Sequence, residues 1–243
     1  MKKYILLFLS VLIFSSCNEE QERVMVTLKF THNWDGVSIT NQDFNSFKFT
    51  NENGELISIE RLRYVISNIT LIGYRGHTLV DVGENSGNNI TIQDLPIGIY
   101  SLKFRFGFSN FDNIDGAYPN LNSVNFNVPE MLGGGYHYMQ FDGKYKDANN
   151  SNANFNYHAI RAVDRTNPDN IILDDTSFVV DLGTIEITNT AEREIKMIIA
   201  EWFKNPNTWD LNQLNTLLMP NFSAQQMISQ NGKSVFSLGS ITQ

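Results

Sequence analysis

The chain of 243 residues contains a single cysteine, Cys17. One cysteine excludes an intrachain disulfide, and it also excludes metal sites built from several thiolates. A metal bound by the folded part of the chain must therefore be held by histidine, methionine or carboxylate side chains.

Long apolar runs are equally scarce, because residues 4–14 form the only one. This run follows Met1-Lys2-Lys3 and precedes the small pair Ser15-Ser16. It is too short for a transmembrane helix, which needs about 20 apolar residues. A basic start, a short apolar core and small residues are typical of a cleavable export signal. We therefore predict a signal peptide over residues 1–16.

Cys17 directly follows the small residues, an order that looks like the bacterial lipoprotein pathway. It predicts cleavage before Cys17 and acylation of its sulfur and new N-terminus, and two or three acyl chains anchor a protein durably. The acidic residues that follow predict a tether over residues 17–23. The expected location is the bacterial cell envelope, lipid-anchored in the outer membrane on its periplasmic or surface face. An ordinary signal peptide followed by an unmodified cysteine is the alternative.

Positive charge is also in short supply. Without Lys2 and Lys3, 16 Lys and Arg residues stand against 26 Asp and Glu residues, a net charge of −10. This balance argues against nucleic acid and against anionic membrane surfaces as partners. The expected link to the membrane is the lipid on Cys17 alone.

The common catalytic motifs are absent from the sequence. It contains no G-x-S-x-G, no glycine-rich phosphate loop before a helix and no H-E-x-x-H. Since no nucleophile, acid and base emerge as a set, we predict that the protein is not an enzyme.

Alternation of apolar and polar residues dominates what remains. The residues Val24, Val26, Leu28 and Phe30 alternate with Met25, Thr27, Lys29 and Thr31, a pattern typical of a half-buried strand. Similar short strands are predicted over residues 44–51, 62–70, 77–82, 88–93, 98–108, 122–128, 136–142, 153–162, 177–187 and 193–200. Their regular spacing predicts a single mostly β domain over residues 24–243, an antiparallel β-sandwich. Asn53-Gly54 predicts a hairpin with a type I′ turn.

Only the C-terminal part favours helices. Asp210 is a candidate N-cap for a helix over residues 211–218, and Ser223 is one for a second helix through Ile228. We therefore expect one or two short C-terminal helices beside the sandwich.

Two histidines are candidate metal ligands. His32 ends the apolar face of the first strand, whereas His158 alternates with Asn154 and Asn156 and so faces polar surroundings or a cleft. On the residues alone, a packed edge histidine is the favoured interpretation of His32 and an exposed one that of His158. Imidazole suits copper in both oxidation states, so a metal role for the two is chemically sound.

Several motifs occur along the chain in a characteristic order. They are Phe30-Thr31-His32, Tyr64-Val65-Ile66-Ser67-Asn68, Phe104-Arg105-Phe106-Gly107-Phe108, Gly135-Tyr136-His137-Tyr138-Met139 and Phe155-Asn156-Tyr157-His158, followed by Trp202-Phe203-Lys204-Asn205-Pro206. The series resembles the MbnP-like copper-binding family, extracytoplasmic proteins and lipoproteins associated with methanobactin and copper uptake. The resemblance covers nearly the whole chain after Cys17.

The resemblance implies a copper site with His32 and His158 as ligands. It also implies a dihaem peroxidase-like partner, which in copper-binding members converts a tryptophan at the metal to kynurenine. This chain has Met131-Leu132-Gly133-Gly134-Gly135-Tyr136 where many relatives carry tryptophan. Trp34 is the nearest substitute and the candidate for a derived kynurenine.

His137 and Met139 are further candidate neighbours of the metal, because alternation places them on one strand face and the pair would suit Cu(I); a packing role is the favoured interpretation. We thus expect a lipid-anchored extracytoplasmic copper-binding protein that acts in acquisition or buffering. The alternative is a non-catalytic binding or scaffold lipoprotein of the same fold with a degenerate metal site.

Overall fold

The computed structural model describes residues 21–72, 76–167 and 169–242. The predicted signal peptide, most of the tether and Cys17 lie outside these residues. Among the described residues, no helix is long and apolar enough to cross a membrane.

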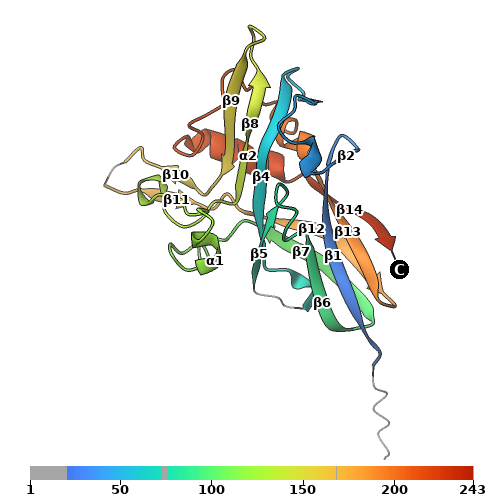
Figure 1. Cartoon of the computed structure of the whole chain (residues 1–243). Helices are drawn as coiled ribbons and strands as arrows, with labels where there is room; N and C mark the ends of the chain where they lie inside the picture. Colours follow the sequence, from blue (N-terminus) through green and yellow to red (C-terminus); the bar gives the residue numbers. More distant parts are fainter. Residues whose placement is uncertain (1–20, 73–75, 168, 243) are drawn as a thin grey trace, which may run out of the picture.

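Strands make up most of the described chain (Figure 1). They are β1 (Arg23–Trp34), β2 (Val37–Ile39), β3 (Phe49–Thr50), β4 (Leu56–Ser67), β5 (His77–Asp81), β6 (Asn89–Pro96), β7 (Gly98–Phe106), β8 (Met139–Lys146), β9 (Asn152–Ala159), β10 (Ala162–Asp164), β11 (Ile172–Asp174), β12 (Phe178–Ile187), β13 (Ala191–Ile198) and β14 (Phe236–Thr242). The helices are α1 (Pro119–Asn122) and α2 (Phe222–Gly232), and short 3-10 helices cover Asn41–Asp43, Thr70–Ile72, Glu130–Leu132 and Ile199–Phe203.

Two sheets form the predicted β-sandwich. One has the order β14-β13-β1-β2, with β6 pairing the first part of β1; the other has the order β12-β7-β4-β8-β9, with β3 and β5 also pairing β4. All pairs are antiparallel except β1 with β13, which run parallel. Strands β10 and β11 form a separate hairpin that projects from the side of the molecule (Figure 1).

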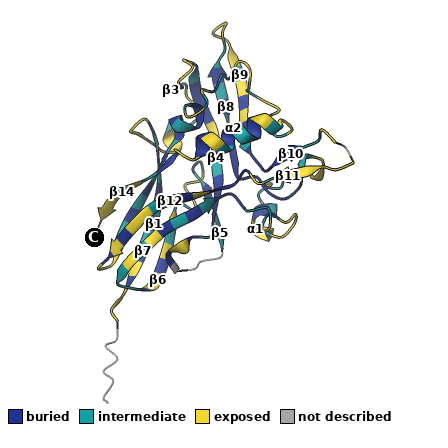
Figure 2. Cartoon of the chain, turned by 180° about the vertical axis from the view of Figure 1, so that it is seen from behind, coloured by how far each residue is buried: buried dark blue, intermediate teal, exposed yellow. Residues whose placement is uncertain are grey.

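Aromatic rings from both sheets fill the interior. Phe30 of β1 meets Phe104 of β7 edge to face at 5.6 Å, and Phe236 of β14 meets Tyr64 of β4 at 6.1 Å. On β7 the neighbours of Phe104, Lys103 and Arg105, are partly exposed, and alternating bands of more and less buried positions are visible on β7 and β12 in Figure 2. The period of two in the sequence therefore reports directly which face of each strand meets the other sheet.

Three local predictions are wrong. Residues 44–51 are mostly irregular, with only Phe49–Thr50 in a strand. Residues 122–128 form no strand, and Asn122 ends the short helix α1. Residues 211–218 are turns rather than a helix, because Asp210 holds an Asx turn through the amide of Asn212 at 2.8 Å while Glu55 accepts the amide of Leu211. These contacts direct the polypeptide away from helical geometry.

Other local predictions are confirmed with small differences. Helix α2 forms as expected, but its N-cap is Asn221, whose side chain accepts a hydrogen bond from the amide of Ala224. Residues 51–54 do turn between β3 and β4, yet of Asn53 and Gly54 only Gly54 has a positive φ, at 89°. The turn is therefore not type I′, which requires positive φ at both central residues.

Candidate metal centre

The outer face of β8 and β9, the face turned away from the other sheet, carries a polar cluster. Phe141 and Tyr157 point inward and are fully buried, so Asp142 and His158 point outward. The Nε2 atom of His158 lies 2.7 Å from Oδ1 of Asp142. Asn156 donates to the same oxygen at 2.7 Å, and Arg61 lies 3.2 Å from the other carboxylate oxygen. The imidazole of His158 is thus held in place from one side by an ion-paired carboxylate.

A loop brings His137 onto this face. The loop before it depends on Gly135, whose φ is 75° and where a Cβ would lie 2.5 Å from Oδ1 of Asn113. The same Asn113 oxygen accepts the amide of Tyr136 at 2.8 Å. The backbone of His137 then donates to the carbonyl of Phe126 at 3.0 Å. Glycine is required here because any side chain would displace the asparagine that fixes the loop.

The two imidazole rings are neighbours. Their centroids lie 5.1 Å apart, with an angle of 85° between the planes. Nε2 of His137 and Nδ1 of His158 are both buried and have no hydrogen-bond partner. We call these two residues the imidazole pair. An unpartnered buried nitrogen is costly, so two on adjoining rings point to an absent ligand.

The hydrogen bonds assign a tautomer to each ring. His137 Nδ1 lies 2.9 Å from the carbonyl oxygen of Phe126, which can only accept, and 3.3 Å from the amide nitrogen of Gln140, which can only donate. The shorter contact favours a proton on Nδ1 and the lone pair on Nε2. His158 Nε2 donates to the Asp142 carboxylate, so Nδ1 carries the lone pair. Metal-binding histidines are held in this way, with the second ring nitrogen donating to a carbonyl or carboxylate.

The electrostatics keep His137 neutral. Burial lowers the pKa of His137 to about 3, and the charge of His158 acts in the same direction. Burial opposes ionisation of Asp142, but its contacts with His158, Asn156 and Arg61 outweigh this and lower the pKa of the carboxyl. Asp142 is therefore a carboxylate and His137 a neutral base at neutral pH.

The donor set limits which metals fit. Among the described residues, no group of three or more His, Cys, Asp or Glu side chains is arranged to hold a metal ion. Zinc sites usually have three or four protein ligands. Two imidazole nitrogens suit a metal that accepts few ligands, and imidazole is a good ligand for copper.

His32 lies elsewhere in the molecule. Its Nε2 is 3.0 Å from the hydroxyl of Tyr64, and Tyr64 stacks on Phe106 between the two sheets. Since Tyr64 points to the interior and His158 to the outer face of the same sheet, His32 and His158 do not share a site. Burial lowers the pKa of His32 to about 4, and burial raises that of the Tyr64 phenol.

The comparisons with known proteins bear on this site. The family model named MbnP matches residues 23–220. The chain belongs to the MbnP family. Among solved structures, it is similar to MbnP from Methylosinus trichosporium, with 14% sequence identity over 72% of this chain and 76% of that one and a TM-score of 0.42. A search of curated proteins finds no match.

Membership of the MbnP family associates the chain with methanobactin and copper, as the sequence motifs imply. Trp34, the candidate for a derived kynurenine, is 5% exposed and stacks on Phe49 at 5.2 Å. Its indole nitrogen donates to the carbonyl of Thr50 at 3.1 Å. These contacts make Trp34 part of the core beside β3 and place it with His32 rather than with the imidazole pair.

Met139 is also separated from His137, although alternation predicts a shared face. Strand β8 begins only at Met139, which is fully buried in the core. Before it, the amide of His137 pairs with Phe126 while that of Tyr138 pairs with Ala159. This change of partner breaks the alternation and turns His137 to the outer face. In the sequence, only the three glycines at 133–135 indicate this break in the alternation.

Proposed function

We propose that this MbnP-family protein binds copper between Nε2 of His137 and Nδ1 of His158. The observation that carries the proposal is the presence of two buried, unpartnered lone pairs on adjoining rings. Each ring already donates its other nitrogen to a fixed acceptor, which leaves the remaining nitrogen free to bind a metal.

Cu(I) fits this donor set better than the commoner divalent ions. Cu(I) accepts two neutral nitrogen ligands, whereas Zn²⁺ normally completes a tetrahedron. Two ligands at about 2 Å from one ion lie at most about 4 Å apart, a spacing that adjoining imidazoles reach with small rotations. The family association with copper supports the same metal.

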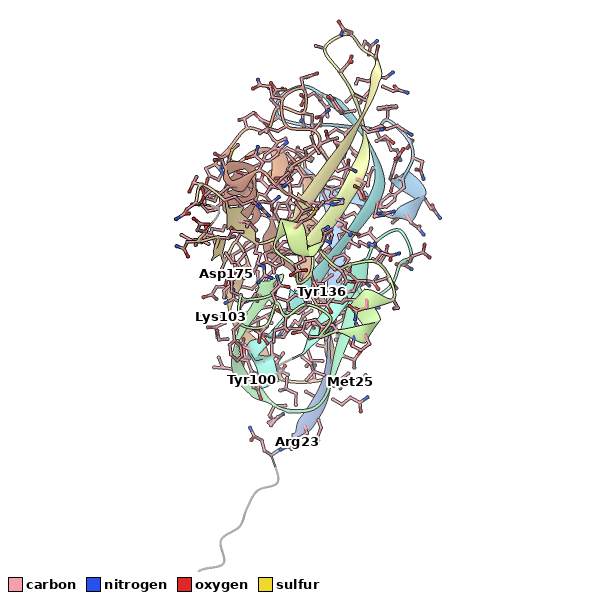
Figure 3. The ribbon with its side chains drawn as sticks, turned by 90° about the vertical axis from the view of Figure 1, so that its left-hand side faces the viewer. Arg23, Met25, Tyr100, Lys103, Tyr136 and Asp175 are labelled. Carbon is pink, nitrogen blue, oxygen red and sulfur yellow. The ribbon has the colours of Figure 1, made fainter. Side chains whose placement is uncertain are left out.

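The role we propose is copper acquisition or buffering at the cell envelope. The export signal and Cys17 favour a lipid-anchored protein, and the described fold begins at Gln21, a few residues after the anchor. In Figure 3, Arg23 lies at the lower end of the molecule, whereas Tyr136, next to His137 in the sequence, lies near its middle. The proposed metal site is therefore separate from the end of the fold that follows the lipid.

A Cu(I) competition titration tests the ligands. The protein and its His137→Ala, His158→Ala and His32→Ala variants would be titrated anaerobically against bicinchoninate, a chromophoric Cu(I) chelator. We expect each substitution in the imidazole pair to lower Cu(I) affinity by more than the roughly 10–100-fold loss seen when a ligand's hydrogen-bond partner is removed. The His32→Ala variant should match the unsubstituted protein. Unchanged affinity in a His137→Ala/His158→Ala double variant would contradict the proposal.

A further inference from the structure

Apolar side chains are exposed on the side of the molecule that carries β10, β11 and α1 (Figures 1 and 2). They come from three segments: Phe111 and Ile114 from the loop before α1, Met131 from the 3-10 helix Glu130–Leu132, and Leu173 from β11. Phe111 is 87% exposed and Met131 is 80% exposed. We call these four residues the apolar patch. Exposed apolar side chains that gather on one surface mark an interaction site.

Contacts between the three segments bring the patch residues together. Asn110, which precedes Phe111, donates from its side-chain amide to the carbonyl of Leu173 at 2.9 Å. Gly133 follows Met131 by two residues and also lies against β11, since a Cβ at Gly133 would be 3.7 Å from the side chain of Leu173. The segments therefore form one surface, in which Leu173 adjoins both of the others.

The patch is joined to the loop that positions His137. Asn113 lies between Phe111 and Ile114 in the sequence, yet it is only 2% exposed. Its Oδ1 accepts the amide of Tyr136 at 2.8 Å. The loop before α1 thus carries apolar side chains on its outer side and a buried asparagine on its inner side, bonded to the residue next to His137. A molecule bound to the patch would contact both segments that hold His137 in place.

Carboxylates outnumber cations around the patch. The three segments, taken with β10 and the residues that flank it, contain seven acidic and two basic side chains. A third cation, Arg105 of β7, pairs with Asp175 at 3.9 Å. Three positive and seven negative charges leave a net charge of −4. An apolar surface with this surplus is complementary to an apolar surface surrounded by lysine and arginine. The acidic residues are Asp112, Asp115, Glu130, Asp164, Asp169, Asp174 and Asp175, and the other two cations are Arg161 and Arg165.

We propose that the apolar patch docks a protein that exchanges copper with the imidazole pair, through a contact surface of apolar side chains surrounded by lysine and arginine. This inference rests on the proposed copper site. A second copy of this chain and an anionic membrane fit the patch less well, because the surrounding carboxylates repel both. Since Asn113 connects the patch to Tyr136, docking there acts on the position of His137 and so on the rate of copper release.

A synthetic amphipathic helix with a leucine face bordered by lysines is the probe for this surface. A helix with glutamate in place of lysine tests the charge requirement. Calorimetry would measure the affinity of each helix for the copper-free protein and for its Phe111→Ser/Met131→Ser and Ile99→Ser variants. Ile99 of β7 is the matched control, because it is 73% exposed and lies outside the patch. Thermal unfolding would confirm that each variant is folded.

We expect the leucine–lysine helix to bind the unsubstituted protein and Ile99→Ser equally well. It should bind Phe111→Ser/Met131→Ser at least about tenfold more weakly, because two anchoring side chains are lost. The leucine–glutamate helix should not bind. Equal affinity for the two variants, or equal affinity for the two helices, would overturn the inference. Sedimentation showing that the protein dimerises through the patch would overturn it as well.

A second measurement connects docking to copper. The release of Cu(I) from the loaded protein to bicinchoninate would be timed with and without the leucine–lysine helix. The bound helix should change the release rate of the unsubstituted protein and leave that of Phe111→Ser/Met131→Ser unchanged. An unchanged rate with the helix bound would contradict copper exchange at the patch. Because calorimetry uses copper-free protein, it judges docking separately; if the unsubstituted protein binds no Cu(I), the copper site itself fails.

Discussion

Two buried histidines, His32 and His137, differ in what their second nitrogen meets. Their side chains are similarly sequestered, and burial lowers the pKa of both, to about 4 and about 3. Nε2 of His32 is satisfied by the hydroxyl of Tyr64. Nε2 of His137 has no partner, and its ring adjoins that of His158, which also has an unpartnered nitrogen.

The comparison teaches that burial and a shifted pKa do not identify a metal ligand. Both properties follow from desolvation, which acts on any imidazole packed inside a protein. The two sites differ in whether Nε2 of the buried histidine has a hydrogen-bond partner. A histidine such as His32, whose buried Nε2 has a hydrogen-bond partner, fits a role in the core, whereas two adjoining rings with buried unpartnered nitrogens are candidates for binding a ligand.

His32 and His137 should contribute similarly to the pH dependence of stability. Both histidines are ordinary bases near pH 6.5 when unfolded and remain neutral in the fold to about pH 4 and about pH 3. Below pH 6.5 the unfolded chain therefore binds protons that the folded chain does not, and stability is lost as pH falls. Each histidine should contribute up to about 1.4 kcal/mol per pH unit in this window.

Urea unfolding of the copper-free protein at several pH values between about 7 and about 4 measures this slope. His32→Gln and His137→Gln should each reduce it, because glutamine does not titrate. Above pH 6.5 neither variant should change the pH dependence. A slope unaltered by both substitutions would show that other groups dominate the acid sensitivity.

Copper binding should then distinguish the sites through their hydrogen-bond partners. Asp142→Asn weakens the acceptor that orients His158 and should lower Cu(I) affinity about 10–100-fold. Tyr64→Phe removes the partner of His32 and should leave Cu(I) affinity unchanged. Asp181→Asn, which removes a carboxylate from an exposed ion pair, is the matched control. Equal losses in Asp142→Asn and Tyr64→Phe would place the copper near both histidines and contradict the separation of the sites.

Much of the fold could be predicted because the alternation of apolar and polar residues within one strand shows which of its side chains are buried. The alternation from Val24 to Phe30 corresponds to β1, and the polar face of residues 154–158 corresponds to the outer face of β9. Strand β14 gives no such signal, since Ser237, Gly239 and Ser240 are three of its seven residues and it is stabilised by pairing with β13. Predictions fail where partners far along the chain decide the conformation.

The candidate site shows the same limit. His158 was predictable as an outward-facing histidine, and the family resemblance marks it as a ligand. Its pairing with His137 was not, because the pairing requires the amide of His137 to bond to Phe126 and the loop at Gly135 to close over Asn113. The predicted partnership with His32 fails for a simpler reason: the motifs set the order of the histidines along the chain but not the sheet face on which each lies.

The last expected effect concerns the hydrogen bond between Tyr64 and His32. Tyr64→Phe leaves Nε2 of His32 buried without a partner and should reduce the free energy of unfolding by about 1–3 kcal/mol. In a His32→Phe background the same substitution should cost less, since no imidazole then requires the hydroxyl. A double-mutant cycle measured by urea unfolding isolates this coupling. Additive losses would mean that the hydroxyl of Tyr64 stabilises something other than His32, and the contrast with the imidazole pair would then rest on the free lone pairs of His137 and His158 alone.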